Sequence, residues 1–464
     1  MEQVKQKKER ALVNPDRLGQ DPVKSLIKEL AMPAIVAQLI NLLYNIVDRI
    51  YIGRIPETGS LALSGLGIAA PIILTLSAFS AFASFGGAPL ASISLGAGDE
   101  KRAERLLQTN AGYSLLLGVL LTVLTTIYLE PLLYFFGAQE SNLPYAASYL
   151  RIYLIGTTFV LGTLALNSFI SAQGASRVAM RTVLIGAIAN IILDPIFIFT
   201  LKLGVRGAAY ATVLSQALSF ITVLYFLLSK DTKLRLTGLR LDLKLFFEST
   251  KLGISGFTMI ATQSAVATVF NRLLSVHGGE LHVATMVILQ SIIQMLFIPM
   301  NGYIGGVQPL LSYNYGAGNL QRVKEILQRS LILLCSFSFI SAVTVALLPG
   351  LFAWVFTNDP ELASLVRQYL PTFIIGMSIF GLQETAQMYF VGTNQALRSM
   401  FLATLRKIII LIPLCYILSA RYSVYGVYLS EAIADASSAS IAGLMFFSQY
   451  RKFKDLPDLE LKTE

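Results

Sequence analysis

The sequence predicts an all-α integral membrane protein with twelve transmembrane helices in two pseudo-symmetric six-helix lobes. Three observations support this: a very apolar composition, twelve hydrophobic runs of membrane-spanning length, and an internal repeat relating the two halves. Of the 464 residues, 55% are hydrophobic and only 14% are charged, whereas a soluble domain carries about 25% charged residues. So few charges could not cover several soluble domains. With two cysteines and 27 phenylalanines, the composition also excludes a disulfide scaffold and a disordered chain.

The twelve apolar runs are each long enough to cross about 30 Å of hydrocarbon, which takes roughly 20 helical residues. The runs of the first half are 25–53, 61–95, 106–136, 144–172, 176–201 and 206–229. The runs of the second half are 247–276, 282–315, 325–357, 361–391, 397–420 and 424–449. We therefore expect a polar segment at 1–24, an N-lobe at 25–229, a charged linker at 230–246, a C-lobe at 247–449 and a tail at 450–464.

The basic residues predict the orientation of these helices. Most of the 36 lysines and arginines lie at the chain ends, in the linker and in alternate loops, to which we also assign Arg406 and Lys407. Because such residues accumulate on the cytoplasmic side, we expect both termini in the cytoplasm. The net charge of +9 is spread over these loops, so it does not predict nucleic-acid binding. The first 24 residues contain no apolar stretch, so they do not form a signal peptide.

The two halves repeat each other. The sequence Phe-Gly-Gly-Ala-Pro-Leu at 85–90 matches Ile-Gly-Gly-Val-Gln-Pro-Leu at 304–310, which has one inserted residue, and Gly-Ala-Gly at 96–98 recurs at 316–318. Further on, matches at spacings of 218 or 219 residues are Gly174 with Gly392, Pro195 with Pro413 and Gly207 with Gly426. Six helices per repeat predict a parallel repeat with a substrate path between the lobes. These glycine-rich turns lack the lysine of a phosphate-binding loop, so we expect no nucleotide.

The first predicted helix carries a polar stripe. Its members lie at steps of three and four residues, which places them on one helical face: Gln38, Asn41, Asn45 and Asp48. A charged side chain at mid-bilayer costs roughly 2.5–3.5 kcal/mol on insertion scales, so the stripe must face protein or water. It forms either a polar contact between helices or a cavity wall with an acid that binds a cation.

The fifth predicted helix offers a complementary group. Asn190 and Asp194 are four residues apart and share a face. Pro195 has no N–H, so the carbonyl of Ile191 loses its helical partner. Two side-chain oxygens and one freed carbonyl within a turn form a candidate cation cradle. The alternative is that Asp-Pro only marks a kink near the helix end.

The repeat serves as an internal control for these polar groups. The positions matching Asp48, Asn190 and Asp194 in the second half are near Phe270, Ile408 and Ile412. Pro413 is kept opposite Pro195. The architecture is therefore built once with these polar groups and once without them, which favours a functional role over a structural one.

Several segments resemble the multidrug and toxic compound extrusion (MATE) family, and their sequences are most similar to its bacterial MepA-like branch. They are 31–34 (Ala-Met-Pro-Ala), 44–53 (Tyr-Asn-Ile-Val-Asp-Arg-Ile-Tyr-Ile-Gly), the two Gly-Ala-Gly turns and 190–195 (Asn-Ile-Ile-Leu-Asp-Pro). The resemblance covers nearly the whole chain. It implies an antiporter, not an enzyme, of the bacterial cytoplasmic (inner) membrane that expels cationic amphiphilic drugs in exchange for H⁺ or Na⁺. We accordingly expect small-molecule drugs and membrane lipid as partners, no cofactor besides the coupling ion, and a monomer.

The resemblance also implies roles for individual residues. The positions matching the family's ion-coupling pattern are Asp48, Asn167, Asn190, Asp194 and Thr212. Pro33 matches the proline at which the first helix bends, and Pro195 is a second candidate bend. Two carboxylates sharing a dry cavity resist being ionised together and titrate as a coupled unit. The oxygen ligands suit a proton or Na⁺, with no other metal expected, and the sequence does not choose between the two ions.

The second half contributes candidates for the substrate cavity. The eighth predicted helix carries Met286, Gln290, Gln294 and Phe297 at helical spacing, which suits a pocket for aromatic cations or ordinary packing. Glu384 in the tenth helix is a further candidate for coupling or for balancing the charge of a substrate. Glu431 and Asp435, one turn apart in the twelfth helix, are expected to pair with neighbours. His277 and His282 are expected in a solvated outer loop and do not form a zinc site.

Two other functions remain open on the sequence. One is a flippase for lipid-linked sugars or lipids of the same superfamily, although twelve helices and an acidic first half disfavour it. The other is a channel or a membrane protein that transports nothing. Uphill movement of a dye distinguishes an antiporter from a channel or a protein that transports nothing, because a channel cannot concentrate its solute.

Overall fold

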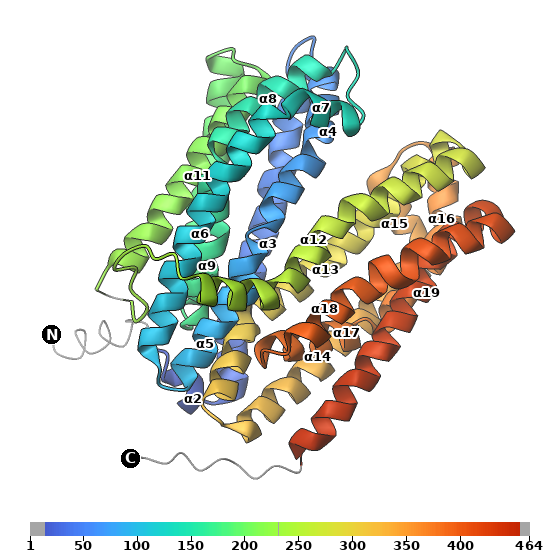
Figure 1. Cartoon of the computed structure of the whole chain (residues 1–464). Helices are drawn as coiled ribbons and strands as arrows, with labels where there is room; N and C mark the ends of the chain where they lie inside the picture. Colours follow the sequence, from blue (N-terminus) through green and yellow to red (C-terminus); the bar gives the residue numbers. More distant parts are fainter. Residues whose placement is uncertain (1–13, 231, 455–464) are drawn as a thin grey trace. The chain divides into compact units, whose positions relative to one another are not determined.

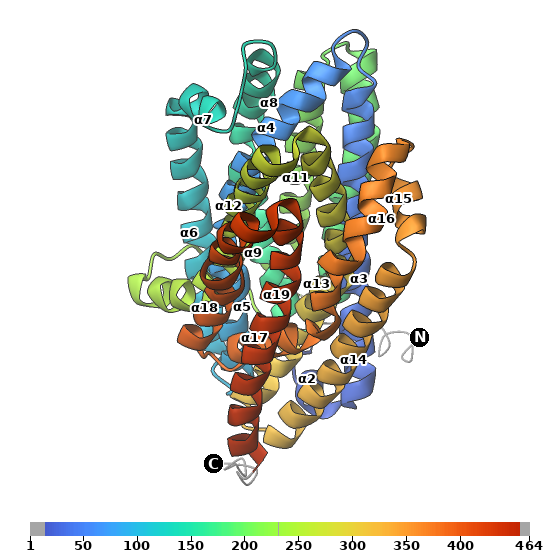
Figure 2. The same cartoon turned by 90° about the vertical axis from the view of Figure 1, so that its right-hand side faces the viewer.

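The computed structural model describes residues 14–230 and 232–454, and the regular elements within these ranges are helices (Figure 1; Figure 2 gives a second view). Most of the predicted segment 1–24 and of the tail 450–464 lies outside the described residues. The apolar segments form helices, which satisfy all backbone hydrogen bonds within one segment, as a hydrocarbon environment requires.

The first half contains the following elements, in which η1 and η2 are short π-helices: α2 (Arg17–Gln20), α3 (Val23–Gly53), α4 (Gly59–Ala78), η1 (Phe82–Gly87), α5 (Ala88–Gly96), α6 (Glu100–Ile127), α7 (Leu129–Phe135), α8 (Leu143–Ile155), α9 (Thr157–Ala172), α10 (Ser176–Pro195), η2 (Ile196–Thr200) and α11 (Val205–Leu228). The predicted runs are found here, with α6 and α7 dividing the third. Helix α6 begins at Glu100, before the predicted start of its apolar run at 106, so its first turns contain the charged residues at 100–105. Asp99 caps this helix by accepting the backbone N–H of Arg102 at 2.9 Å.

The second half contains the following elements, in which η3 is a 3₁₀-helix and η4 a π-helix: α12 (Leu243–Gly278), α13 (Glu280–Gly316), α14 (Leu320–Leu347), α15 (Pro349–Phe356), α16 (Pro360–Ile374), η3 (Ile375–Ile379), α17 (Gly381–Gly392), α18 (Ala396–Thr404), η4 (Leu405–Leu411) and α19 (Ile412–Lys454). Helix α12 begins at Leu243, so the linker without regular structure ends four residues before its predicted end at 246.

Among the described residues, ten helical stretches are long and apolar enough to cross a membrane. The pair α8 and α9, bent by 54° at its break, adds an eleventh if it forms one span. The last stretch, Ala396–Arg451, is 56 residues long and is interrupted at Ser423, whose φ of 52° and ψ of −133° are not helical. The chain is thus an all-helical, multi-pass membrane protein.

The chain divides into two compact units. Unit 1 comprises residues 1–257 and 305–317, and unit 2 comprises 258–304 and 318–464. The first unit therefore includes one end of α12 and one end of α13 besides the helices of the first half. Within unit 1, α10 packs along α3 and α11, and α9 packs against α6 and α11. Within unit 2, α17 packs between α14 and α19.

Local geometry repeats between the halves. Asn319 caps α14 by accepting the N–H of Arg322, as Asp99 does for α6. Gly204 has a φ of 55° and a ψ of −132°, which nearly match those of Ser423, 219 residues later. Serine rarely adopts positive φ. The repeat therefore extends to an unusual backbone conformation that the second half retains without glycine.

The Gly-Ala-Gly turns mark a close crossing of two helix ends in unit 1. A Cβ atom on Gly96 of α5 would lie 1.9 Å from the carbonyl oxygen of Tyr313, and one on Gly316 of α13 would lie 2.0 Å from that of Ile93. The two contacts are related by the 220-residue repeat. Backbone meets backbone here, so only glycine fits.

Gly316→Ala is expected to destabilise the protein, because the added methyl group must push the α5 backbone away. Forcing one extra carbon into a packed site costs about 1–3 kcal/mol. Gly305→Ala on the same helix is the matched control, since a Cβ there meets nothing within 4 Å. Thermal unfolding of the two purified variants checks this. Equal midpoints would show that the crossing tolerates a side chain.

Two loop assignments made from the sequence are wrong. Arg406 and Lys407 lie in η4 inside a helical stretch, and Arg406 is buried. They look like loop residues because positive charge next to an apolar run resembles a membrane boundary. His282 lies in α13, where its ring packs edge-on against Tyr369 and contacts the hydroxyl of Tyr428. It is therefore half-buried among aromatic rings instead of solvated in a loop.

Candidate functional site

The candidate site lies between α3 and α10 of unit 1. Asp48 on α3 is 9% exposed, and Asn190 and Asp194 on α10 are 3% and 0% exposed. The packing of α10 along α3 brings Asp48, the buried member of the polar stripe, to the acidic face of α10. The structure therefore gathers the three side chains that the repeat comparison singled out.

The two carboxyl groups are in hydrogen-bonding contact. Asp48 and Asp194 share a side-chain hydrogen bond, and the amide nitrogen Nδ2 of Asn190 donates to Oδ1 of Asp194 at 3.3 Å. An ionised carboxylate has no donor, so a hydrogen bond between two carboxyl groups requires a proton on one of them. The contact is compatible with an acid pair that shares one proton.

Apart from the contact between the two carboxyl groups, three oxygen atoms of this site accept no hydrogen bond: Oδ1 of Asp48, Oδ1 of Asn190 and Oδ2 of Asp194. Each is buried, and buried polar atoms without a partner need an explanation. Carboxylate and amide oxygens are hard ligands of the kind that bind hard cations. The donor set present therefore fits a small hard cation as well as a proton.

Tyr149 of α8 belongs to the site, although the sequence analysis did not identify it. Its side chain is 3% exposed, interacts electrostatically with both carboxyl groups and forms a side-chain hydrogen bond with Thr212. Thr212 in turn donates to the carbonyl of Ala208 at 3.0 Å. Thr212 is thus connected to the acids through Tyr149. With 20 tyrosines in the chain, no local pattern distinguishes this one.

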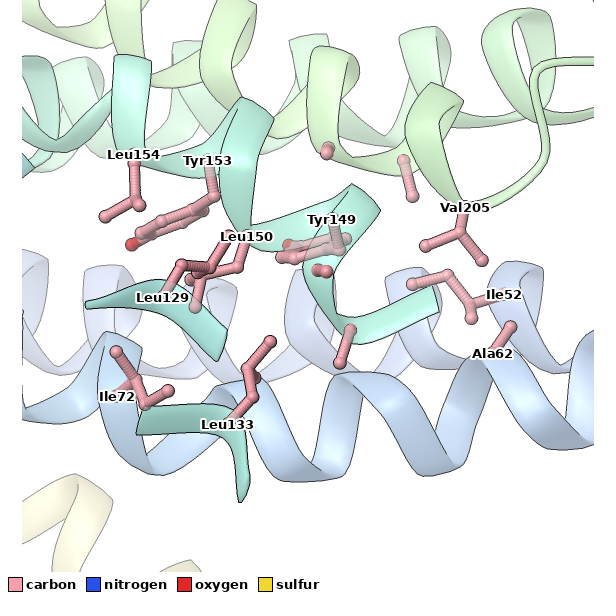
Figure 3. Close-up of a cluster of buried hydrophobic side chains, with 14 of the residues drawn as sticks. Ile52, Ala62, Ile72, Leu129, Leu133, Tyr149, Leu150, Tyr153, Leu154 and Val205 are labelled. Atoms are coloured by element: carbon pink, nitrogen blue, oxygen red, sulfur yellow. The ribbon is translucent and has the colours of Figure 1, made fainter. Parts of the chain in front are cut away.

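A hydrophobic cluster lies beside the site. It joins Ile52, one turn after Asp48, to Tyr149, Leu150 and Tyr153 of α8 and to Val205 of α11 (Figure 3). The rings of Tyr149 and Tyr153 stack with centroids 6.1 Å apart. Such packing keeps water out, which strengthens electrostatic interactions inside.

One residue of the predicted coupling set, Asn167, lies elsewhere. Asn167 of α9 donates to the carbonyl of Ala179 at 3.3 Å and accepts from Thr182 at 3.1 Å. Both partners lie at least two turns before Asn190 on α10. These contacts connect Asn167 to the first half of α10, away from the acid pair.

The two predicted bends differ. Pro33 is buried inside α3, which continues through it. Pro195 is the last residue of α10, and the π-helix η2 follows directly. A wider turn at this point accommodates the proline, which cannot continue the regular bonding.

The predicted substrate-cavity residues of α3 are more open than Asp48. Gln38 and Asn45 are exposed and Asn41 is half-buried, and the amide of Asn45 donates to the carbonyl of Asn41 at 2.6 Å. The stripe therefore runs from an accessible end to the buried acid, a polar path along one helix.

The predicted cavity residues of unit 2 have varied surroundings. Met286 is 1% exposed and Glu384 is 5% exposed, whereas Gln290 is half-buried and Gln294 is exposed. The ring of Phe297 packs edge-on against Phe380 at 5.1 Å. Met286 therefore packs inside the unit, and the glutamines are the accessible members of the stripe.

Unit 2 contains a second charged cluster, of which the two acids were predicted to pair with neighbours but the cation was not predicted. Arg406 of η4 forms ion pairs with Glu431, at 2.8 Å, and with Asp435, both on α19. Its guanidinium lies 4.7 Å from the ring centroid of Phe380 and 5.5 Å from that of Phe297. Lys407 donates to the carbonyl of Met259 at 2.9 Å. In this cluster the acids hold a cation that belongs to the chain.

Comparison with known proteins agrees with this architecture. The family model MatE matches residues 33–196 and again residues 256–417. The "Multidrug export protein MepA" of Staphylococcus haemolyticus (strain JCSC1435) is 28% identical over 423 residues, covering 90% of this chain and 92% of that protein. Its namesake in Staphylococcus aureus (strain MSSA476) is 24% identical, with 92% and 94% covered.

Solved structures share the fold. A MATE crystallised in complex with MaL6 has a TM-score of 0.87 at 22% identity, covering 95% of this chain and 99% of that one. An outward-facing multidrug resistance MATE family transporter of the MOP superfamily has a TM-score of 0.88 at 21% identity, with 95% and 98% covered. Since the family model matches well over half of its residues, this chain belongs to the MatE family of membrane transporters.

Proposed function

We propose that this chain is a secondary-active multidrug efflux antiporter, which exports cationic amphiphilic drugs and toxic compounds in exchange for H⁺ or Na⁺ by alternating access. The buried pair Asp48–Asp194 carries the proposal. Such acids are costly inside a membrane span, and the repeat builds the same fold with Phe270 and Ile412 at the matching positions. The cargo is inferred from the relatives, which are named as multidrug export proteins.

The acid pair supplies the ion-dependent step of this mechanism. One proton or a small cation bound between the two carboxyl groups attracts both of them. The bound ion therefore holds α3 against α10. After the ion leaves, two negative charges face each other in a water-poor site and repel. An ion can shift a conformational equilibrium only by its differential affinity for the two states. The ion therefore binds more tightly when α3 and α10 are close together than when they are apart.

The neighbouring side chains hold the pair in place. Asn190 donates to Asp194 and so orients its carboxyl group. Tyr149 and Thr212 form the adjoining wall. The break in regular α-helix after Pro195 gives this end of α10 freedom to bend when the ion leaves.

The proposed topology has twelve spans with both termini in the cytoplasm, as a monomer in a bacterial inner membrane. One regular helix of 56 residues would be about 84 Å long, nearly three times the hydrocarbon thickness. The break at Ser423 supports two spans in this stretch. Together with α8 and α9 as one bent span, this makes twelve.

Reconstitution of the full-length protein in liposomes tests the function. Ethidium movement is followed with a proton gradient and a sodium gradient imposed separately. We expect uphill ethidium transport under one of them and none without a gradient. Transport only down the ethidium gradient would indicate a channel and contradict the proposal.

A further inference from the structure

Unit 1 has an apolar groove away from the acid pair. Its volume is about 350 Å³. The walls come from Ala111 and Leu115 of α6 and from Phe220 and Leu224 of α11, with Leu166 of α9 between them. The linker residues 236–239 line one end. Every lining side chain except Thr237 is apolar, and the hydroxyl of Thr237 already accepts from Gln108 at 2.8 Å.

The groove is elongated along the helices. Phe220, Leu224 and Leu228 line it at four-residue steps, so it follows α11 for about 12 Å at 1.5 Å per residue. Helices α6, α9 and α11, which form it, lie side by side in unit 1 (Figure 1). An apolar groove that runs along membrane-spanning helices fits a lipid acyl chain in direction and in chemistry.

The side chain of Arg235 lies at the linker end of the groove. Nη2 of Arg235 reaches the carbonyl of Leu228, a lining residue, at the long distance of 3.5 Å. Its Nε is buried and has no hydrogen-bond partner. Leaving a buried donor unpaired costs about 1–3 kcal/mol, and guanidinium groups match phosphate geometry. The arginine is therefore placed to receive an anionic group at the mouth of the groove.

The surrounding charges favour an anion. The linker 230–246 carries Lys230, Lys233, Arg235, Arg240 and Lys244 against two aspartates. Lys233 is engaged with Glu100 at 2.6 Å, and this interaction raises the pKa of Lys233 above its ordinary value. The carboxylate of Asp242 accepts the backbone N–H groups of Lys244 and Leu245 at the start of α12. Arg235 and Arg240 have no ion-pair partner in the described ranges, so this end keeps a positive surplus.

We propose that this groove is a binding site for an anionic phospholipid, with one acyl chain between α6 and α11 and its phosphate at Arg235. The site is separate from the acid pair and does not depend on the transport activity. The headgroup end of the groove is formed by the linker that joins the two halves. The bound lipid therefore stabilises the packing of the linker on α6 and α11.

Native mass spectrometry of the purified full-length protein tests this site, with titration by dioleoyl phosphatidylglycerol or dioleoyl phosphatidylcholine. We expect one phosphatidylglycerol to bind more tightly than phosphatidylcholine. Arg235→Gln should weaken it about fivefold, the effect of one basic residue near an anionic lipid surface. Lys101→Gln is the matched control, because Lys101 is an exposed cation of the same unit that does not line the groove.

A second pair of variants tests the acyl chain. Leu115→Trp fills the groove and should remove the tightly bound lipid, whereas Leu116→Trp, on the neighbouring lipid-exposed position, should not. Size-exclusion profiles establish that both variants fold. Equal binding of the two lipids, or unchanged phosphatidylglycerol binding by folded Leu115→Trp, would overturn the proposal. Displacement of the lipid by ethidium at equal concentration would also overturn it, since the groove would then be a drug site.

Discussion

Ion-driven ethidium efflux is expected to disappear in Asp48→Asn and in Asp194→Asn, while both variants still fold. Asparagine keeps the size of aspartate but cannot release a proton or carry the negative charge that binds a cation. Without a difference in ion affinity between two states, a gradient cannot shift their populations. Efflux in liposomes under an imposed gradient should therefore fall to the level of protein-free vesicles. Size-exclusion profiles and expression should stay close to those of the unchanged protein.

The double variant and an acid of unit 2 serve as controls. Asp48→Asn/Asp194→Asn should be no worse than either single variant, because residues acting as one unit are not additive. Glu384→Gln removes a buried acid of unit 2 and should retain gradient-driven efflux. Normal efflux by both single variants would place coupling elsewhere. Loss of efflux only in Glu384→Gln would assign it to unit 2.

Much of the fold could be predicted because hydrocarbon imposes simple rules. Long apolar runs must be helical, and the matches at spacings of 218–220 residues predicted equivalent helices. The repeat also relates Gly204 to Ser423, but the serine alone gives no sign of a positive φ. The break inside the last helical stretch was nevertheless predicted from hydropathy, because the runs 397–420 and 424–449 leave a boundary at this position.

The acid pair was predictable for an energetic reason. Asp48, Asn190 and Asp194 are costly in a membrane span, and their replacement by apolar residues in the other half shows that the fold does not need them. Tyr149 carries no such signal, since an apolar ring with one hydroxyl group packs well in any core.

The Arg406 cluster was missed because its members are far apart along the chain. Arg406 is 25 residues before Glu431 and 29 before Asp435. A pairing of this separation leaves no local pattern. The positive charges also resembled a cytoplasmic boundary, because the rule that places Lys and Arg in cytoplasmic loops does not recognise a cation neutralised inside the protein.

Arg406→Met is expected to destabilise the protein by about 3–5 kcal/mol, the usual cost of removing one partner of a buried ion pair. Arg406 is only 10% exposed at its side chain, and Glu431 and Asp435 are 9% and 1% exposed. Without the guanidinium, the two buried acids lose the cation that is hydrogen-bonded to both of them. The change should lower the thermal unfolding midpoint in detergent and reduce the folded yield.

Two further variants separate the charge effect from lost packing. Arg329→Met breaks an exposed pair with Glu325 that has the same 2.8 Å distance, and exposed pairs contribute only about 0–1 kcal/mol. Its unfolding midpoint should stay near that of the unchanged protein. The triple variant Arg406→Met/Glu431→Gln/Asp435→Asn removes all three charges, so it should recover much of the stability that Arg406→Met loses. If the triple variant is as unstable as Arg406→Met, then the packing of Arg406 on Phe297 and Phe380 stabilises unit 2 more than its ion pairs do.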